Sequence, residues 1–561
     1  MLQWQSLFPG TVEKYMRNRA LTTTFLIILA GGTALGLQSG NSSENKPRAS
    51  LSPLPDSRYF EALKTAEPFR AAGLPTYYDL RAVGKMTPVR NEGILGGSPA
   101  FAVLASLESF LKPLENWDFS ENHLRTTTGN AGSLDILMGA LAGWSDPVRE
   151  ADSPWPASRR DDIAAVKHVQ NVQVLPPRTG SLDNDRIKQT VLDTGAVFAP
   201  MVYTESLFNP AQSSYYNSGT PGETRAVVIA GWDDNFDRSR FSPQPPGNGA
   251  FLCKNSRGTE WGSSGYFYVS YHDVFFCRTA LPASFTTEPR SGSTVNYQYD
   301  PNGCTIRMGF EDEAAWFANI FDSSSADPLV AVSFYTYAPS SDYEILIYKD
   351  PTPGRPRSGT LARRLTGSLT AAGYVTVPLD APVPLLLNQR FSAVVKLRTA
   401  GDFFPIPIEH PVPGLTAIFT ANPGQSFVSA DGLNWNDLVS YDGTKYAKTN
   451  VCLKAFAGYA PFHPPAEFKV ERLVNNLFFF KEYVDKLSWQ LNPRNTQPPA
   501  HYRIYRKFEA AAETDFRLLD EVGPSPFFYF VRAVNKDEAF VYRITAVLAD
   551  GRESDPSEFS I

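Results

Sequence analysis

Helical periodicity stops near residue 290, and this change constrains the fold more than any other feature of the sequence. Over 74–290, apolar residues recur at helical spacing in 99–111, 134–143 and 185–194, and short strand-like runs follow. These runs are "RAVVIAGW", "GAFLCKNS" and "GYFYVSY", which are rich in β-branched and aromatic residues and bounded by Gly, Asn and Pro. Helices followed by a sheet predict an α+β domain.

Beyond residue 290, strand patterns take over. Runs such as "LVAVSFYTY", "YEILIYK" and "FSAVVKL" alternate with turn clusters up to about residue 460, which predicts an antiparallel β-sandwich. A "PFHPP" linker then opens a last unit, in which "HYRIYRKF" and "VYRITAVLADGRESDPS" are spaced as strands of a second sandwich. A chain of 561 residues is too long for one core, so we expect several independent cores.

The N-terminus predicts an export signal. Lys14, Arg17 and Arg19 precede an apolar run over 20–37, and a polar segment follows. We expect cleavage of this leader, with an uncleaved N-terminal anchor as the alternative. The expected organisation is therefore a signal peptide or anchor (1–37), a linker or short pro-like segment (38–73) with a helical pattern over 58–73, and three domains at 74–290, 291–460 and 461–561.

Charge and cysteine content exclude some classes of partner and cofactor. The net charge of -6, with basic and acidic residues interspersed, gives no basic stripe for nucleic acid. Membrane contact is expected only through the N-terminal segment. In an exported chain the cysteines permit the pairs Cys253–Cys277 and Cys304–Cys452, or they are free buried thiols. Because no CxxC spacing occurs and the histidines are scattered, we expect no metal site and no cofactor.

The α+β region carries a family resemblance. The segments "LPTYYDLRAVGKMTPVRNEG", "TRAVVIAGWDD" and "KNSRGTEWGSSGYFYVSY", together with the helix that begins at "SPAF", resemble a papain-family cysteine peptidase in order and separation. The resemblance covers about 210 residues and implies the papain-like fold.

The chemistry of that family needs a thiolate at a helix N-terminus, an imidazole base, an amide that orients the imidazole, and an oxyanion donor. The resemblance places the nucleophile at Ser98, the base at Arg225, the orienting amide at Asn255 and the oxyanion donor at Glu92. Arginine stays protonated and is no general base, and a glutamate would repel the developing oxyanion. Only Asn255 keeps the family's residue, so the sequence predicts an inactive peptidase fold, or pseudopeptidase.

The sequence contains other candidate nucleophiles and bases. Ser98 could attack only with a neighbouring base, and His123, His168 and His272 lie outside the matching segments. Cys253 lies two residues before Asn255 and could serve as a displaced thiol nucleophile, but a buried core cysteine fits its strand better. Residual or unconventional hydrolase activity stays as the alternative function.

The substitutions also have a structural interpretation. Ser98 is a good N-cap, and Pro99 suits the first helical position. The resemblance implies that Glu92 and Arg225 face each other across the former cleft, where they either form an ion pair, with Arg257 as a competitor, or remain solvated charges.

The two later domains have resemblances of their own. The region from "YQYDPNGCTIRMGF" to "NVCLKAFAGY" resembles the lectin-like sandwich that follows papain-family domains in some exported bacterial proteins. Trp316, Phe317 and Trp435 could stack on a sugar or form core, whereas fold alone implies no sugar binding. The last domain resembles fibronectin type III, with Trp489 and Tyr542 as core residues.

Together these features predict an exported, bacterial, envelope-associated or extracellular protein. Its papain-like cleft is expected to hold a peptide or protein segment without cutting it, and its β-domains to contact a glycan or a cell-surface protein. A passive structural or adhesion protein of the envelope is the second alternative, since it needs no ligand in the cleft.

Overall fold

The computed structural model describes residues 49–51, 69–129, 133–157, 160, 162–289, 293–413, 417–476 and 481–561. The predicted export signal lies outside these residues, as does most of the predicted helical pattern over 58–73. Within the described part of the chain, no helix combines the length and the apolar character needed to cross a membrane.

Four α-helices are described in the first domain: α2 (Ser98–Leu111), α3 (Glu121–Thr127), α4 (Leu134–Ala142) and α5 (Asp185–Thr194). The predicted helices at 99–111, 134–143 and 185–194 are thereby confirmed. The sequence analysis missed α3, although Ser120 marks its start, because its side chain accepts a hydrogen bond from the His123 backbone N–H as an N-cap.

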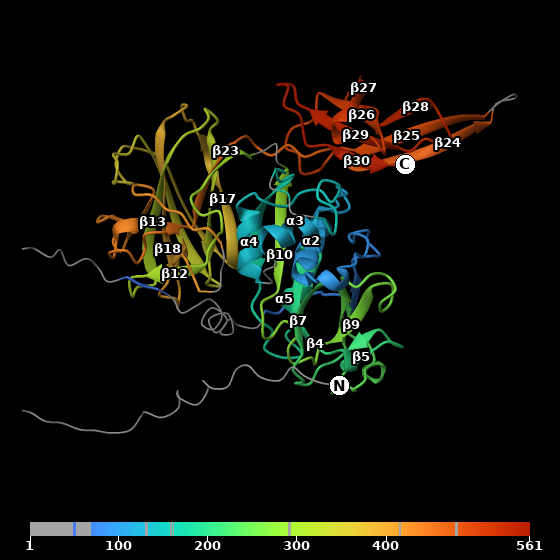
Figure 1. The fold of residues 1–561 in the computed structure, drawn as a ribbon, viewed down its shortest axis with the longest axis horizontal. Coiled ribbons are helices and arrows are strands. Elements are labelled where there is room, and N and C mark those ends of the chain that lie inside the picture. The colour runs from blue at the N-terminus through green and yellow to red at the C-terminus, as the bar shows by residue number, and fades with distance from the viewer. Residues whose placement is uncertain are drawn as a thin grey trace, which may run out of the picture. The chain divides into compact units, whose positions relative to one another are not determined.

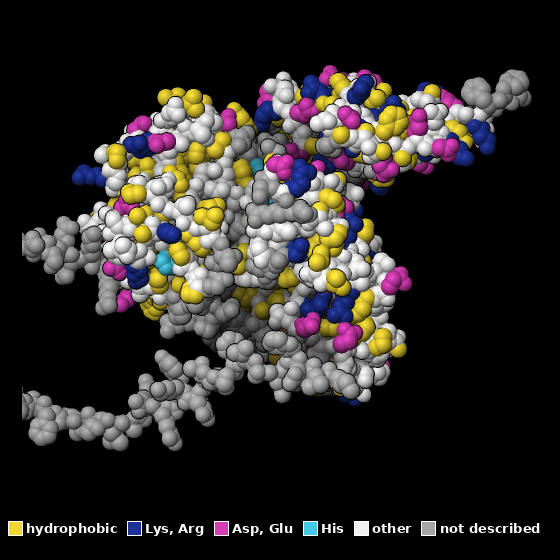
Figure 2. Space-filling view, in the orientation of Figure 1, with side chains coloured by type: hydrophobic (Ala, Val, Ile, Leu, Met, Phe, Trp, Pro, Cys, Tyr) yellow, Lys and Arg dark blue, Asp and Glu magenta, His cyan; other side chains and the backbone are white. Residues whose placement is uncertain are grey.

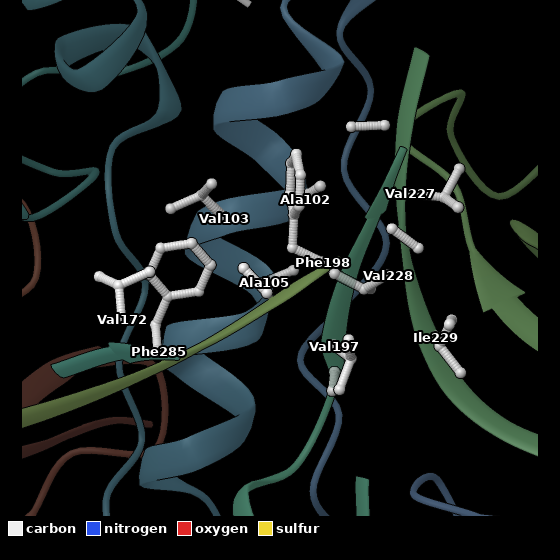
Figure 3. Packing of buried hydrophobic residues seen from close by; sticks show 14 of the residues in the cluster. Ala102, Val103, Ala105, Val172, Val197, Phe198, Val227, Val228, Ile229 and Phe285 are labelled. Atoms are coloured by element: carbon white, nitrogen blue, oxygen red, sulfur yellow. The ribbon is translucent and has the colours of Figure 1, made fainter. Parts of the chain in front are cut away.

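Helix α2 is buried on nearly all sides, which makes it the central helix of the domain. Figure 3 shows Ala102, Val103 and Ala105 of α2 among side chains from the adjacent strands, including Phe198 and Phe285. The strands of this domain are β2 (Tyr77–Asp79), β3 (Lys167–Val174), β4 (Val197–Tyr203), β5 (Phe208–Asn209), β6 (Ser214–Tyr215), β7 (Glu223–Asp233), β8 (Ala250–Lys254), β9 (Tyr266–Ser270) and β10 (Ala283–Pro289). This packing fixes the start of α2 close to β7.

The described strands after residue 290 pair in the antiparallel sense, as predicted. They are β11 (Ser293–Tyr297), β12 (Ile306–Gly309), β13 (Ala314–Asp322), β14 (Leu329–Thr336), β15 (Ser341–Lys349), β16 (Thr360–Leu369), β17 (Ala372–Val383), β18 (Arg390–Thr399), β19 (Ile406–Glu409), β20 (Ser426–Ser429), β21 (Asn436–Asp437), β22 (Asn450–Val451) and β23 (Leu453–Gly458). One sheet has the order β16-β15-β18-β13-β20-β21, and a smaller one has the order β1-β12-β19-β22, in which β1 is Ser50–Leu51.

One sheet runs through the first two domains, although each domain has a main core cluster of its own, as expected. Its order is β11-β23-β14-β17-β3-β10-β4-β7-β8-β9-β6-β5, and β17 pairs with β3 through Ala372, Gly373 and Tyr374. Gly373 is required at this junction: its φ is +128°, and a Cβ there would lie 1.8 Å from the carbonyl oxygen of Val172. Tyr374 consequently belongs to the same buried cluster as α2.

The last domain comprises β24 (Ala466–Asn476), β25 (Lys481–Gln490), β26 (His501–Phe508), β27 (Arg517–Val522), β28 (Phe528–Val534), β29 (Phe540–Val547) and β30 (Ser557–Ser560). One sheet has the order β24-β25-β28, and the other has the order β27-β26-β29-β30 (Figure 1). Trp489 and Tyr542 lie in the core between them, which confirms the prediction for both residues.

The structure also shows the state of the cysteines and the distribution of surface charge. All of the cysteines are free and buried, so of the two alternatives the structure has thiols, not disulfides. Figure 2 shows Lys and Arg side chains interspersed with Asp and Glu on the visible face, which agrees with the absence of a basic stripe in the sequence.

Candidate functional site

The N-terminus of α2 differs from the prediction for Ser98. Gly97, in a left-handed conformation with φ of +117°, is the N-cap, and Ser98 is the first helical residue. A Cβ on Gly97 would lie 2.9 Å from the side chain of Arg125. The prediction of Ser98 as N-cap is therefore wrong, because glycine alone suits the tight, positive-φ entry to the helix.

The Ser98 hydroxyl is engaged by the neighbouring strand. Ser98 is buried, and its Oγ accepts a hydrogen bond of 3.1 Å from the backbone N–H of Ala226 in β7. This bond ties the start of α2 to the strand that carries Arg225. An imidazole that could take the Ser98 proton is missing at this strand position, because residue 225 is an arginine.

Arg225 and Glu92 form an ion pair across the site. The Glu92 carboxylate is 4% exposed and the Arg225 side chain 16% exposed, and Glu223 lies 3.8 Å from the same guanidinium. The backbone N–H of Glu92 donates a 2.8 Å hydrogen bond to the carbonyl of Ser256, which holds this residue in place. Of the two alternatives for Glu92 and Arg225, the structure has the ion pair.

Burial changes the acidity of the guanidinium without removing its charge. Desolvation, and next the charge of Arg257, lower the pKa of Arg225 to about 10. At neutral pH the group is therefore still a cation, and it has no lone pair with which to accept a proton.

Arg257 has a different partner from the predicted one. Its guanidinium pairs with Glu205 at 2.8 Å and lies 4.7 Å from the ring centre of Tyr203 and 5.8 Å from that of Trp261. In the structure Arg257 thus binds Glu205 and not Glu92, and the predicted competition is not seen.

Asn255 is buried next to this site, but its side chain serves the local backbone. The side-chain Oδ1 of Asn255 accepts a 2.8 Å hydrogen bond from the backbone N–H of Ser256. The backbone N–H of Asn255 donates to the carbonyl of Gly265. The structure thus brings Ser98, Arg225, Glu92 and Asn255 around one location, because β7 and β8 are neighbours in the sheet and α2 packs on β7.

A buried polar network lies behind the site, and the sequence analysis missed it. Glu108 of α2 accepts hydrogen bonds from Thr87 Oγ1 at 2.6 Å and from the Phe119 N–H at 3.0 Å, and Lys254 Nζ donates to the Thr87 carbonyl at 3.1 Å. Burial raises the pKa of Glu108 and lowers that of Lys254. A glutamate, the one ionisable residue of a mostly apolar helix, was the signal that could have found this network.

The network borders a cavity of about 20 Å³, which has room for about one water molecule. Glu108, Glu121, Lys254, Asn255 and Ser256 are among its lining residues. A cavity of this size has no room for a substrate.

The other candidate nucleophiles and bases are engaged elsewhere. His123 is buried with Nδ1 2.8 Å from Asp146 Oδ1, His168 stacks on Trp144 with ring centres 3.5 Å apart, and His272 lies beside Gly247. Cys253 is fully buried, and burial raises the pKa of its thiol well above the ordinary value. Burial thus disfavours a displaced thiol nucleophile at Cys253, because the thiolate is the reactive form.

The structure also bears on the metal and sugar sites. Among the residues that the structure describes, no group of three or more His, Cys, Asp or Glu side chains could hold a metal ion. Trp316 and Phe317 are buried, with Arg357 4.8 Å from the Trp316 ring centre, which favours core for these two residues. Trp435 is half-buried, and its indole N–H donates to the carbonyl of Gly432.

Comparisons with known proteins agree with this architecture. Residues 74–286 match the family model "Papain family cysteine protease", and residues 296–457 match "Lectin like domain". Cathepsin J of Mus musculus is 27% identical over 234 residues, which is 38% of this chain and 65% of the cathepsin. The chain therefore spans about two thirds of the length of this curated relative.

Solved structures give the same order of domains. The cysteine protease and lectin-like domains of Cwp84, a surface layer associated protein of Clostridium difficile, superpose with a TM-score of 0.61 at 22% identity, covering 73% of this chain and 98% of that one. A clostridial Cwp84 structure after propeptide cleavage gives a TM-score of 0.59 at 24% identity, covering 68% and 99% of the two chains. This protein thus contains a papain-family domain followed by a lectin-like domain.

Proposed function

We propose that this protein is an exported pseudopeptidase, which holds a peptide or protein segment in the cleft of its papain-family domain without cleaving it. The observation that carries the proposal is the ion pair of Glu92 and Arg225. A protonated guanidinium occupies the position of the catalytic base, and a carboxylate occupies that of the oxyanion donor.

Ser98 supports the same conclusion. Acyl transfer requires a nucleophile that can lose its proton to a base as it attacks. Here the hydroxyl oxygen accepts the Ala226 N–H, and Arg225, at the expected position of the base, is a cation. The competing hypothesis, residual peptidase activity, would need a base brought to Ser98 by the substrate or by a rearrangement.

The β-rich regions are proposed to attach the protein to a surface. The sheet orders β24-β25-β28 and β27-β26-β29-β30 support a fibronectin type III assignment for the last domain, which would act as a spacer or adhesion module. The lectin-like domain would contact a glycan or a cell-surface protein. Cwp84 is described as surface layer associated, and by analogy we propose that this protein lies outside the cell or at a bacterial envelope.

The absence of cleavage is tested with the full-length protein on denatured casein and on a fluorogenic peptide library. We expect no hydrolysis above that of a mock purification, and no difference between the wild type and Ser98→Ala. Hydrolysis by the wild type that Ser98→Ala abolishes would overturn the proposal.

Peptide retention is measured separately by fluorescence anisotropy with labelled casein peptides. We expect saturable binding by the wild type and at least tenfold weaker binding by Ile94→Asp, because Ile94 is fully exposed just before α2. Leu182→Asp, which changes an exposed leucine in the loop before α5, is the matched control and should bind as the wild type does. Equal binding by all three proteins would reject the cleft as the binding site.

Restoring the papain-family residues at positions 92, 98 and 225 tests whether these three side chains face one another. The triple variant Ser98→Cys, Arg225→His and Glu92→Gln should react with iodoacetamide at residue 98 faster than Ser98→Cys alone, because an imidazole lowers the pKa of a nearby thiol. Equal rates for the two variants would show that these side chains do not face one another.

A further inference from the structure

A short segment near the N-terminus lies on the lectin-like domain. Strand β1 pairs antiparallel with β12, with Ser50 opposite Gly309 and Leu51 opposite Met308. Figure 1 shows this short blue segment beside β12. It forms the outer strand of the sheet β1-β12-β19-β22.

Side chains fix the position of the segment as well. Leu51 and Ala49 pack against the apolar core of the lectin-like domain, in which Met308 is fully buried. The backbone of Ala49 also hydrogen-bonds to the Tyr441 hydroxyl. The contact therefore combines main-chain pairing with the packing of two apolar side chains, those of Ala49 and Leu51, which is how sheet edges recognise extended peptides.

The N-terminal region has a second attachment, which residues 69–71 make to the first domain. After residues 52–68 the described chain resumes at Phe69, whose ring centre lies 4.9 Å from the Arg186 guanidinium. Arg70 donates to the carbonyl of Leu182, and the Ala71 N–H donates to Asp185 at the start of α5. Two separate attachments thus flank a stretch of 17 residues, 52–68.

The first attachment is small compared with the sheet that it extends. Strand β1 contributes two residues, whereas β12 also pairs with β19 over Ile306, Arg307 and Met308. Gly309 also lies close to the backbone of Phe403, since a Cβ on Gly309 would lie 1.8 Å from the Phe403 carbonyl oxygen. The sheet is therefore held together without β1, and loss of β1 would leave an open strand edge above an apolar contact.

We propose that the β12 edge of the lectin-like domain is a strand-acceptor site for an extended peptide, and that its occupant in this protein is its own segment Ala49–Leu51. A cut between residues 52 and 68 makes the occupant a separate peptide, which then exchanges with peptides of the same sequence. The ligand class is an extended segment with an apolar side chain at the Leu51 position. The proposal does not depend on the proposed function of the cleft.

The experiment uses the full chain with a site-specific protease sequence inserted between residues 52 and 68. A labelled peptide of residues 45–55 is added before and after cutting, with a scrambled peptide of equal composition and a Leu51→Asp peptide as controls. We expect the cut protein to bind the native peptide at least tenfold more tightly than either control, and the uncut protein to bind it at least tenfold more weakly than the cut protein does.

Hydrogen exchange of the uncut chain gives an independent readout. Leu51→Asp in the full chain should speed exchange in 306–310 and leave exchange in α2 unchanged, and it should allow the uncut chain to bind the native peptide. Equal binding of the native and control peptides, equal binding before and after cutting, or unchanged exchange in 306–310 would each overturn the proposal.

Discussion

Removal of the Arg225 charge is expected to destabilise the start of α2 strongly. In Arg225→Met the Glu92 carboxylate, which is 4% exposed, loses the cation that compensates its burial. Breaking a buried ion pair from one side costs about 3–5 kcal/mol, because the remaining charge stays out of water. Glu92→Gln should cost less, about 1–2 kcal/mol, since Arg225 is more exposed and Glu223 lies 3.8 Å away.

The double variant separates this explanation from a simple loss of packing. In Glu92→Gln with Arg225→Met no uncompensated charge is buried, so we expect stability within about 1 kcal/mol of the wild type. The two single changes should therefore couple by at least about 2 kcal/mol. Arg160→Met is the matched control: its partner Asp162 is 70% exposed, and breaking that surface pair should cost less than about 1 kcal/mol.

Hydrogen exchange of the α2 amides measures these free energies locally, because a chain of several domains does not unfold in one two-state step. Additive costs in the double variant, or a cost below about 1 kcal/mol for Arg225→Met, would refute the reasoning. Either result would mean that Glu92 is solvated in solution.

Three further predictions concern the site and its supports. Ser98→Ala should destabilise the start of α2 by about 1–3 kcal/mol in hydrogen exchange of the α2 amides, since the buried Ala226 N–H loses its acceptor; a neutral result would count against this bond. Burial, and next Asp300, raise the pKa of Glu409 to about 7, so this carboxyl's contribution to stability is present below about pH 4.5 and lost as the pH rises through 7. Glu409→Gln should remove up to about 3 kcal/mol of that loss between pH 5 and 8, measured by hydrogen exchange in 406–409 after correction for the intrinsic exchange rate, and parallel pH profiles would contradict this. Gly373→Val should disrupt the pairing of β17 with β3, seen as faster hydrogen exchange in 167–174, because its Cβ would meet the Val172 carbonyl; unchanged exchange would exclude that clash.

Local sequence patterns were sufficient for many elements. Helices α2, α4 and α5 were predictable because each keeps apolar residues on a helical period, and β7, β8, β9 and β26 were predictable from β-branched and aromatic runs. Helix α3 was missed because it is short and mostly polar, although Ser120 and Glu121 mark its start. The junction of β17 with β3 was not predictable, because strand partners so far apart in sequence leave no local signal.

The identities of the site residues were likewise readable, but their interactions were not. The sequence, through its family resemblance, predicts that Ser98, Arg225 and Glu92 stand at the positions of the nucleophile, the base and the oxyanion donor, and the sequence by itself determined that these three residues offer no thiol, imidazole or amide. Only the tertiary structure decided that Glu92 binds Arg225 while Arg257 binds Glu205, and that the Ser98 hydroxyl binds Ala226. These choices depend on which charged and polar groups the sheet and α2 bury within reach of one another, and burial is a property of the folded chain.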